Sequence, residues 1–300
     1  MVSMKPNNQL MRTCAFLKSK YGIDIIKEFP RKTKVPSRKF ITRDLDIIKV
    51  DFEKKAHLYD APANYLASVL SSIPQVHAVK HRVKKPDHLI RKIIRRRIKK
   101  GVEYANLGNY LVKIKDIIGL RILHLFKEEW AEIDKSIQKI FNVVGTPIAY
   151  VTTGERPDII DLYKSNGCKI VLREKYRSIH YKILFAPTKS VDHIFFAEIQ
   201  IRTLFDEACG EVDHRCIYPN NEENELFLQN IYKISELSQR ADLYGSMLMH
   251  QFALQQEPGS LLEHKKHRKY VDNIVHCLAL QLEGEGPVKP FTQEDLVKRK

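Results

Sequence analysis

One strip of polar residues combines the side chains that phosphate chemistry requires. Residues 193–202 alternate between apolar and polar types, so Glu198, Gln200 and Arg202 project to the same side of a predicted strand. A carboxylate suits a cation and a guanidinium suits an anion, so the strip fits a phosphate bound to a metal ion. The same alternation is also typical of an ordinary solvated face of an antiparallel sheet.

A second carboxylate, Asp116, stands just before residues 119–126, an apolar run that predicts a buried strand. Mg²⁺ typically takes one or two protein carboxylates and keeps much of its water. If the two strands are neighbours, Asp116 and Glu198 would supply that pair, and we expect a magnesium site there. The alternative is that Asp116 only caps a turn.

An aromatic residue and a guanidinium stand where a loop enters the strand predicted for residues 178–185. Tyr176 could stack on a base at this position, and Arg177 could bind phosphate. These two residues therefore favour a nucleotide as ligand.

Cations are dense upstream of Asp116. Arg82 and Lys84 lead into a strongly basic helix that the sequence predicts from Pro86 to about Gly101. Cations on one helix repel one another unless anions are present, which favours phosphate binding, although a solvated basic helix would have the same sequence.

The composition agrees with an anionic partner. The 300 residues carry a formal net charge of +15, which favours nucleotides, nucleic acid or an anionic membrane surface. Five scattered cysteines show neither a disulfide framework nor zinc spacing, and no apolar stretch has the length of a signal peptide or a membrane span. We therefore expect a cytoplasmic protein without a membrane partner.

Helical and strand patterns alternate along the chain and predict an α+β fold: a mixed sheet of about five strands flanked by helices, with extra helices at both termini. A helix is predicted over residues 44–73 with a break or kink at Pro62, and Thr203 is predicted to cap a helix that ends near Arg215. A long amphipathic helix over residues 222–252 favours core packing or an oligomer contact. The strands are predicted at residues 76–84, 119–126, 169–172, 178–185 and 193–202.

Four motifs, taken in order, resemble the synthetase domain of the RelA/SpoT family of alarmone synthetases. They are His81-Arg82-Val83-Lys84, Asp116-Ile117-Ile118-Gly119-Leu120-Arg121, Tyr176-Arg177-Ser178-Ile179-His180-Tyr181, and Glu198-Ile199-Gln200-Ile201-Arg202-Thr203 followed by Asp213-His214. The resemblance implies a nucleotidyltransferase-like synthetase fold. It divides the chain into an N-terminal extension over residues 1–43, a synthetase domain over residues 44–220 and a helical C-terminal extension over residues 221–300.

The resemblance also implies a role for each matching residue. Asp116 and Glu198 look like the catalytic pair that holds Mg²⁺, and Tyr176 looks like the residue that stacks on the acceptor's guanine. The ATP-binding residues implied are Arg82, Lys84, Lys92 and Arg121. The further acceptor contacts implied are His180, Gln200 and His214.

The implied reaction transfers pyrophosphate from ATP to the ribose 3′-hydroxyl of GDP or GTP. Some small relatives instead modify adenine nucleotides or the 3′ end of tRNA, and the positive charge keeps an RNA acceptor open. Departures from the family pattern, such as Lys175 in place of a usual glycine, leave the acceptor open. Another alternative is an inactive nucleotide- or RNA-binding module. No His-Asp hydrolase signature occurs in the sequence, so we expect synthesis without hydrolysis. In some relatives the C-terminal helices form oligomers, so the resemblance also leaves a homo-oligomer open.

Overall fold

A computed structural model describes residues 8–24, 28–29, 37–101, 104–185, 195–216, 224–255, 265, 267–272 and 274–275. The chain forms two compact units whose segments alternate along the sequence. Unit 1 comprises Met1–Asn64, Arg82–Gly119 and Phe185–Ala197, and unit 2 comprises Tyr65–His81, Leu120–Leu184 and Glu198–Lys300. The described residues of each unit include a buried apolar core.

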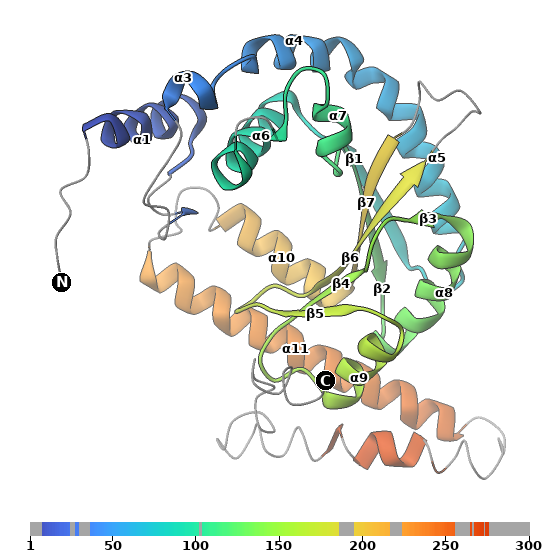
Figure 1. Ribbon diagram of the computed structural model, residues 1–300. Helices are drawn as coiled ribbons and strands as arrows, with labels where there is room; N and C mark the ends of the chain where they lie inside the picture. Colours follow the sequence, from blue (N-terminus) through green and yellow to red (C-terminus); the bar gives the residue numbers. More distant parts are fainter. Residues whose placement is uncertain are drawn as a thin grey trace. The chain divides into compact units, whose positions relative to one another are not determined.

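The described part of unit 1 is mainly helical. Its elements are α1 (Asn8–Tyr21), α3 (Arg38–Ile41), α4 (Leu45–Lys55), the 3₁₀ helix η1 (Ala56–Tyr59), the start of α5 (Asp60–Ser71), α6 (Pro86–Lys100) and α7 (Tyr110–Lys113). α4 and α6 pack against each other (Figure 1), and each has buried apolar residues, such as Phe52 on α4 and Ile93 on α6. Pro62 lies in the first turn of α5, where its missing N–H breaks no helical hydrogen bond. The predicted break therefore occurs earlier, at η1.

Helix α6 begins and ends where the sequence predicts. Pro86 is its first residue, and Gly101 follows its last with a φ of +95°, a backbone conformation that glycine adopts without strain. One of its cations has a structural role: Arg97 is buried and donates to the backbone carbonyls of Ala105, Ile41 and Arg43. The guanidinium of Arg97 thus ties α6 to two neighbouring loops.

In the part of the chain that the structure describes, the sheet has seven strands rather than the predicted five or so. They are β1 (Ala78–Val83), β2 (Ile118–His124), β3 (Asn142–Val143), β4 (Ile148–Val151), β5 (Lys169–Leu172), β6 (Ser178–Phe185) and β7 (Phe195–Thr203). The strand order is β1-β2-β7-β6-β4-β5, and β3 pairs with β6 outside this path. β4 runs parallel to β5 and antiparallel to β6, which makes the sheet mixed and confirms the α+β class. The sequence did not predict β4, nor β3, which at two residues is too short to show an alternating pattern.

Helices cover the sheet within unit 2. They are η3 (Lys127–Glu129), α8 (Trp130–Ile140) and α9 (Pro157–Ser165). The buried indole of Trp130 on α8 donates to the hydroxyl of Tyr181 on β6 at 3.1 Å, and that hydroxyl donates to Asp134 at 2.6 Å. The ring of Tyr163 on α9 packs edge-on against Trp130. One aromatic cluster thus joins both helices to the sheet.

Two further helices follow β7 in unit 2 and lie side by side (Figure 1): α10 (Leu204–Cys216) and α11 (Glu225–Gln255). Thr203 caps α10 as predicted, because its hydroxyl accepts a hydrogen bond from the backbone N–H of Asp206 at 3.1 Å. Among the described residues, no helix is both long enough and apolar enough to cross a bilayer.

Candidate active site

In unit 1, the predicted metal ligand Asp116 binds two of the predicted phosphate contacts. Its Oδ2 lies 2.9 Å from Nζ of Lys84 and 2.5 Å from Nζ of Lys92. Burial lowers the pKa of Lys84, and the neighbouring Asp116 carboxylate opposes that shift. One carboxylate therefore faces two cations, an arrangement with excess positive charge that suits phosphate.

The second oxygen of Asp116 has the properties expected of a cation ligand. Oδ1 is buried and has no hydrogen-bond partner among the described residues, although the side chain as a whole is 15% exposed. A buried carboxylate oxygen without a donor is unfavourable, and a hard cation such as Mg²⁺ would satisfy it. No group of three or more candidate metal ligands occurs within the described ranges.

Arg82, the other ATP-binding residue predicted in this unit, is an exposed residue of β1. Its side chain passes Gly119, and a Cβ at that glycine would lie 3.6 Å from Cγ and Nε of Arg82. The backbone N–H of Lys84 donates to the carbonyl of Ile117 at 2.8 Å. The segments that carry Lys84 and Asp116 are therefore adjacent, and this places the lysine beside the carboxylate.

In unit 2, the polar strip of β7 forms as predicted. Ala197, Ile199 and Ile201 are buried, whereas Glu198 and Gln200 on the other face are half-buried. Gln200 donates to Oε2 of Glu198 at 3.1 Å. Nδ1 of His180 on β6 lies 3.6 Å from Oε1 of Glu198. The structure therefore brings three predicted site residues together: Glu198, Gln200 and His180.

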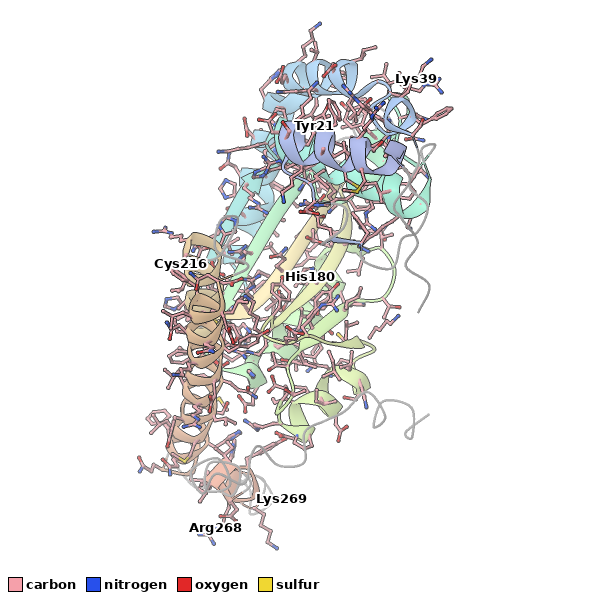
Figure 2. The ribbon with its side chains drawn as sticks, turned by 90° about the vertical axis from the view of Figure 1, so that its left-hand side faces the viewer. Tyr21, Lys39, His180, Cys216, Arg268 and Lys269 are labelled. Carbon is pink, nitrogen blue, oxygen red and sulfur yellow. The ribbon has the colours of Figure 1, made fainter. Side chains whose placement is uncertain are left out.

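Tyr176, the predicted stacking residue, contacts this group through His180. Figure 2 shows His180 on the face of the sheet. The hydroxyl of Tyr176 lies 2.8 Å from Nε2 of His180. Tyr150, on β4, packs edge-on against both rings, with centroid distances of 5.7 Å to Tyr176 and 4.8 Å to His180. The guanidinium of Arg202 lies 4.8 Å from the centroid of the Tyr176 ring. The result is a cluster of aromatic rings with one guanidinium, which suits a nucleobase.

The sequence did not predict Tyr150 as a site residue. The only signal that could have found it was strand β4 itself, which places Tyr150 opposite Ser178 and therefore on the face that also carries His180.

Arg121 is held by carboxylates in unit 2. Its Nη1 lies 2.9 Å from Glu207 and 3.0 Å from Glu211, both on α10. Lys80 and Arg202 also pair with Glu207, at 2.9 Å and 3.3 Å. Burial disfavours the charge on Glu207, but hydrogen bonds from Lys80 and Arg121 outweigh it and hold the pKa of Glu207 below its ordinary value. Sequence reasoning missed this carboxylate because only the tertiary fold gathers its three partners.

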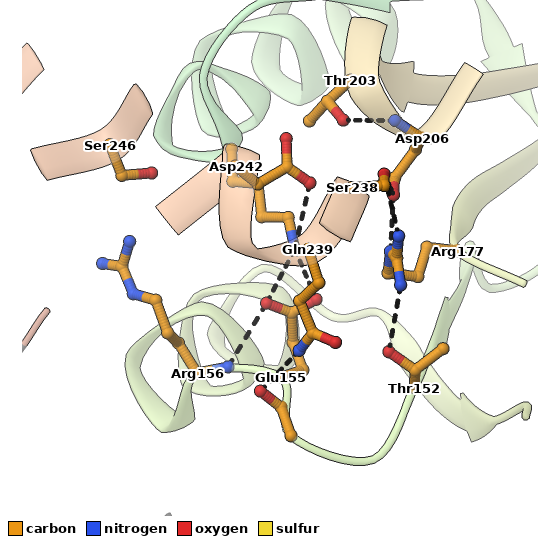
Figure 3. A network of polar contacts seen from close by, with 12 residues as sticks. Thr152, Glu155, Arg156, Arg177, Thr203, Asp206, Ser238, Gln239, Asp242 and Ser246 are labelled. Atoms are coloured by element: carbon orange, nitrogen blue, oxygen red, sulfur yellow. Dashed lines mark hydrogen bonds and ion pairs between the residues drawn. The ribbon is translucent and has the colours of Figure 1, made fainter. Parts of the chain in front are cut away.

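The structure corrects the interpretation of Arg177 as a phosphate contact. Arg177 is buried, makes an ion pair with Asp206 and donates to Thr152 and Ser238 (Figure 3). It also donates to Ser235. A guanidinium saturated by internal acceptors has a structural role.

His214 is exposed near the end of α10, next to Asp213, which pairs with Lys175 at 2.5 Å. Its contact with the acceptor stays a prediction.

A comparison with known families decides what these residues belong to. Residues 81–223 match the family described as "Region found in RelA / SpoT proteins". The chain contains a RelA/SpoT domain. All the predicted site residues, from Arg82 to His214, lie within this RelA/SpoT domain. The Asp116–Glu198 pair draws on both units, and its joint binding of one metal ion stays a prediction.

Solved structures with the same fold support this assignment. The small alarmone synthetase 1 from Bacillus subtilis is 22% identical to the chain, with a TM-score of 0.50 over 68% of this chain and 98% of that one. A structure of the same enzyme bound to AMPCPP is 21% identical, with a TM-score of 0.51 over 69% and 99%. No curated protein sequence matches the chain significantly. The RelA/SpoT domain thus has the fold of a small alarmone synthetase.

Proposed function

We propose that this protein is an ATP-dependent pyrophosphokinase that transfers pyrophosphate to the ribose 3′-hydroxyl of GDP or GTP. The observation that carries the proposal is the Asp116 cluster, in which one carboxylate faces two lysines and keeps a buried oxygen without a donor. Such a cluster, in a domain that matches the RelA/SpoT family, suits the triphosphate of ATP with its magnesium ion.

The donor side of the reaction consists of cations and carboxylates. Lys84 and Lys92 bind the phosphates once these displace the lysines from Asp116, and Asp116 and Glu198 are the residues that would hold Mg²⁺. When bound, Mg²⁺ neutralises charge on the transferred group. Arg82 and Arg121 hold the adenine, as the family resemblance implies. The AMPCPP bound to the fold-similar Bacillus subtilis enzyme supports an adenine nucleotide as donor.

The acceptor side consists of the aromatic cluster. The base stacks on Tyr176, and Tyr150 and His180 hold the ring of Tyr176 from its edges. The 3′-hydroxyl then attacks the β-phosphorus of ATP, AMP leaves, and Glu198 is the group that draws the hydroxyl proton. Most of the acceleration comes from positioning and charge neutralisation, as in other phosphoryl transfers.

An RNA acceptor is the second candidate, and one observation favours it. The ring of Tyr104 lies 4.9 Å from Nζ of Lys100 and 5.8 Å from Nζ of Lys113, on a chain with a net charge of +15. An aromatic ring between cations suits a single-stranded nucleic acid. Transfer to the 3′ end of tRNA would use the same donor chemistry.

A direct test incubates the protein with Mg²⁺ and ATP labelled at the β-phosphorus, together with GDP, GTP, ATP or tRNA in separate reactions. The proposal expects AMP release together with label on GDP or GTP. Label only on tRNA, or only on a 3′-pyrophosphorylated product of ATP, would overturn the guanosine acceptor and keep the transfer. No labelled product with any acceptor would overturn the transfer itself and favour a binding module.

A further inference from the structure

The segment that carries Tyr176 is held by α10 and α11 of unit 2. Glu174 accepts a hydrogen bond from the hydroxyl of Tyr232 on α11 at 2.6 Å. The carbonyl of Lys175 accepts one from Ser235 on α11 at 3.5 Å. The ammonium of Lys175 pairs with Asp213 on α10. Both residues that precede Tyr176 are therefore fixed to these helices.

The residue that follows Tyr176 is held more firmly. Arg177 is only 7% exposed, and its Nη2 donates to the carbonyl of Ser235 at 3.1 Å and to the hydroxyl of Ser238 at 3.0 Å. Its Nη1 donates to the hydroxyl of Ser235 at 3.2 Å. Its Nε pairs with Asp206 at 2.5 Å (Figure 3). A buried guanidinium with this many acceptors has one permitted orientation.

The three residues of α11 that make these contacts lie on one face of the helix. Tyr232, Ser235 and Ser238 are spaced three apart, which brings them to neighbouring positions along the helix surface. Ser235 and Ser238 are buried, at 5% and 8% exposure, where an apolar side chain would be the usual occupant. Apolar packing does not call for two serines there, whereas binding Arg177 does.

We infer that α11 sets the geometry of the acceptor site: Ser235 and Ser238 fix Arg177, which acts as a positioning residue for Tyr176. This rests on the proposed function, in which Tyr176 stacks on the acceptor base. Tyr176 lies between two anchored residues, so α11 determines where its ring stands relative to His180 and Arg202. Displacing this face of α11 would displace the ring and leave the donor residues Lys84, Lys92 and Asp116 unchanged.

The test compares the double substitution Ser235→Ala/Ser238→Ala with Ser246→Ala. Ser246 is a matched control, because it is a buried serine of the same helix that donates to Glu128 rather than to the Tyr176 segment. For the double variant we expect a KM for GDP raised about tenfold, with kcat and the KM for ATP unchanged, since lost stacking geometry weakens binding of the acceptor alone. The control should keep all three values.

Amide hydrogen exchange in the peptide over residues 174–180 gives a readout that needs no activity. Exchange there should quicken in the double variant and not in Ser246→Ala. If the double variant does not fold, Tyr232→Phe takes its place, because Tyr232 is 41% exposed and its loss of one hydroxyl spares the core. It too should quicken exchange in this peptide.

The results distinguish a failure of the inference about α11 from a failure of the proposed function. Unchanged exchange over residues 174–180 in every variant, or equal effects of the double variant and Ser246→Ala, would overturn the inference. A wild-type protein that transfers pyrophosphate to no acceptor would overturn the proposed function, while the exchange data would still decide whether α11 fixes the Tyr176 segment.

Discussion

The hydroxyl of Tyr176 lies 2.8 Å from Nε2 of His180, four residues further along the chain. This contact spans the entrance of β6 and connects the predicted stacking ring to Glu198, whose Oε1 lies 3.6 Å from Nδ1 of the same imidazole. His180 therefore contacts both the ring that would stack on the acceptor base and the carboxylate that would receive the proton of the acceptor's 3′-hydroxyl. A single side chain can thus couple acceptor binding to the reacting group.

Replacing Tyr176 should separate stacking from hydrogen bonding. Tyr176→Ala should raise the KM for the acceptor by about 5- to 150-fold, because stacking of a base on an aromatic ring contributes about 1–3 kcal/mol. Tyr176→Phe keeps the ring and loses only the hydrogen bond to His180, so its KM should stay within a few-fold of wild type. Steady-state kinetics with varied GDP measures both, and Tyr244→Ala, at an exposed tyrosine of α11, is the control. An unchanged KM in Tyr176→Ala would exclude stacking.

Neutralising either predicted metal ligand should abolish transfer and keep the fold. Asp116→Asn and Glu198→Gln should each lower kcat by about 10²-fold or more, because charge stabilisation in the transition state is among the largest catalytic terms. AMP release measures the rate, and circular dichroism checks the fold. Glu132→Gln is a suitable control, since Glu132 is an exposed carboxylate that pairs with Lys135, three residues further along α8. Near-normal turnover in Asp116→Asn or Glu198→Gln would reject this site.

Removing the buried guanidinium of Arg97 should destabilise the protein. Arg97→Met leaves the carbonyls of Ala105, Ile41 and Arg43 without their donor. We expect a loss of about 3 kcal/mol or more, because three acceptors lose their donor and each buried acceptor left unpaired costs about 1–3 kcal/mol. Urea unfolding measures the change. Arg96→Met, one residue earlier on α6 and half-buried, should cost much less. Equal losses in both variants would mean that the cost comes from helix charge rather than from the lost hydrogen bonds.

The buried carboxylate of Asp242 should make stability depend on pH. Burial raises the pKa of Asp242 to about 8, and the neighbouring carboxylate of Asp206 adds to the shift. Between the ordinary carboxyl pKa of about 3.9 and this value, the folded protein holds a proton that the unfolded chain releases, so this group's contribution to stability falls as pH rises.

Asp242→Asn removes that dependence. The variant should therefore melt at a higher temperature than wild type near pH 8, with a smaller difference near pH 5. Thermal unfolding at a series of pH values measures both curves, and Asp158→Asn, at a partly exposed ion pair with Arg156, is the control. A constant offset between Asp242→Asn and wild type at every pH would contradict a titrating Asp242.

The sequence alone predicted the chemistry-bearing positions and most of the elements. The alternation along β7 put Glu198 and Gln200 on one polar face, and Pro86 and Gly101 delimited α6, because these signals depend only on neighbouring residues. The same dependence on neighbouring residues is why the sequence did not predict β3, since a strand of two residues carries no pattern of its own.

The tertiary structure decided what each side chain does. Arg177 and Arg202 both suggest phosphate binding in the sequence, yet one is saturated by Asp206 and two serines of α11 and the other pairs with Glu207. Asp116 and its two lysines became a cluster only through the adjacency of distant segments. A residue's type fixes which contacts it can make, whereas burial and the partners brought from elsewhere in the chain decide which of them it makes.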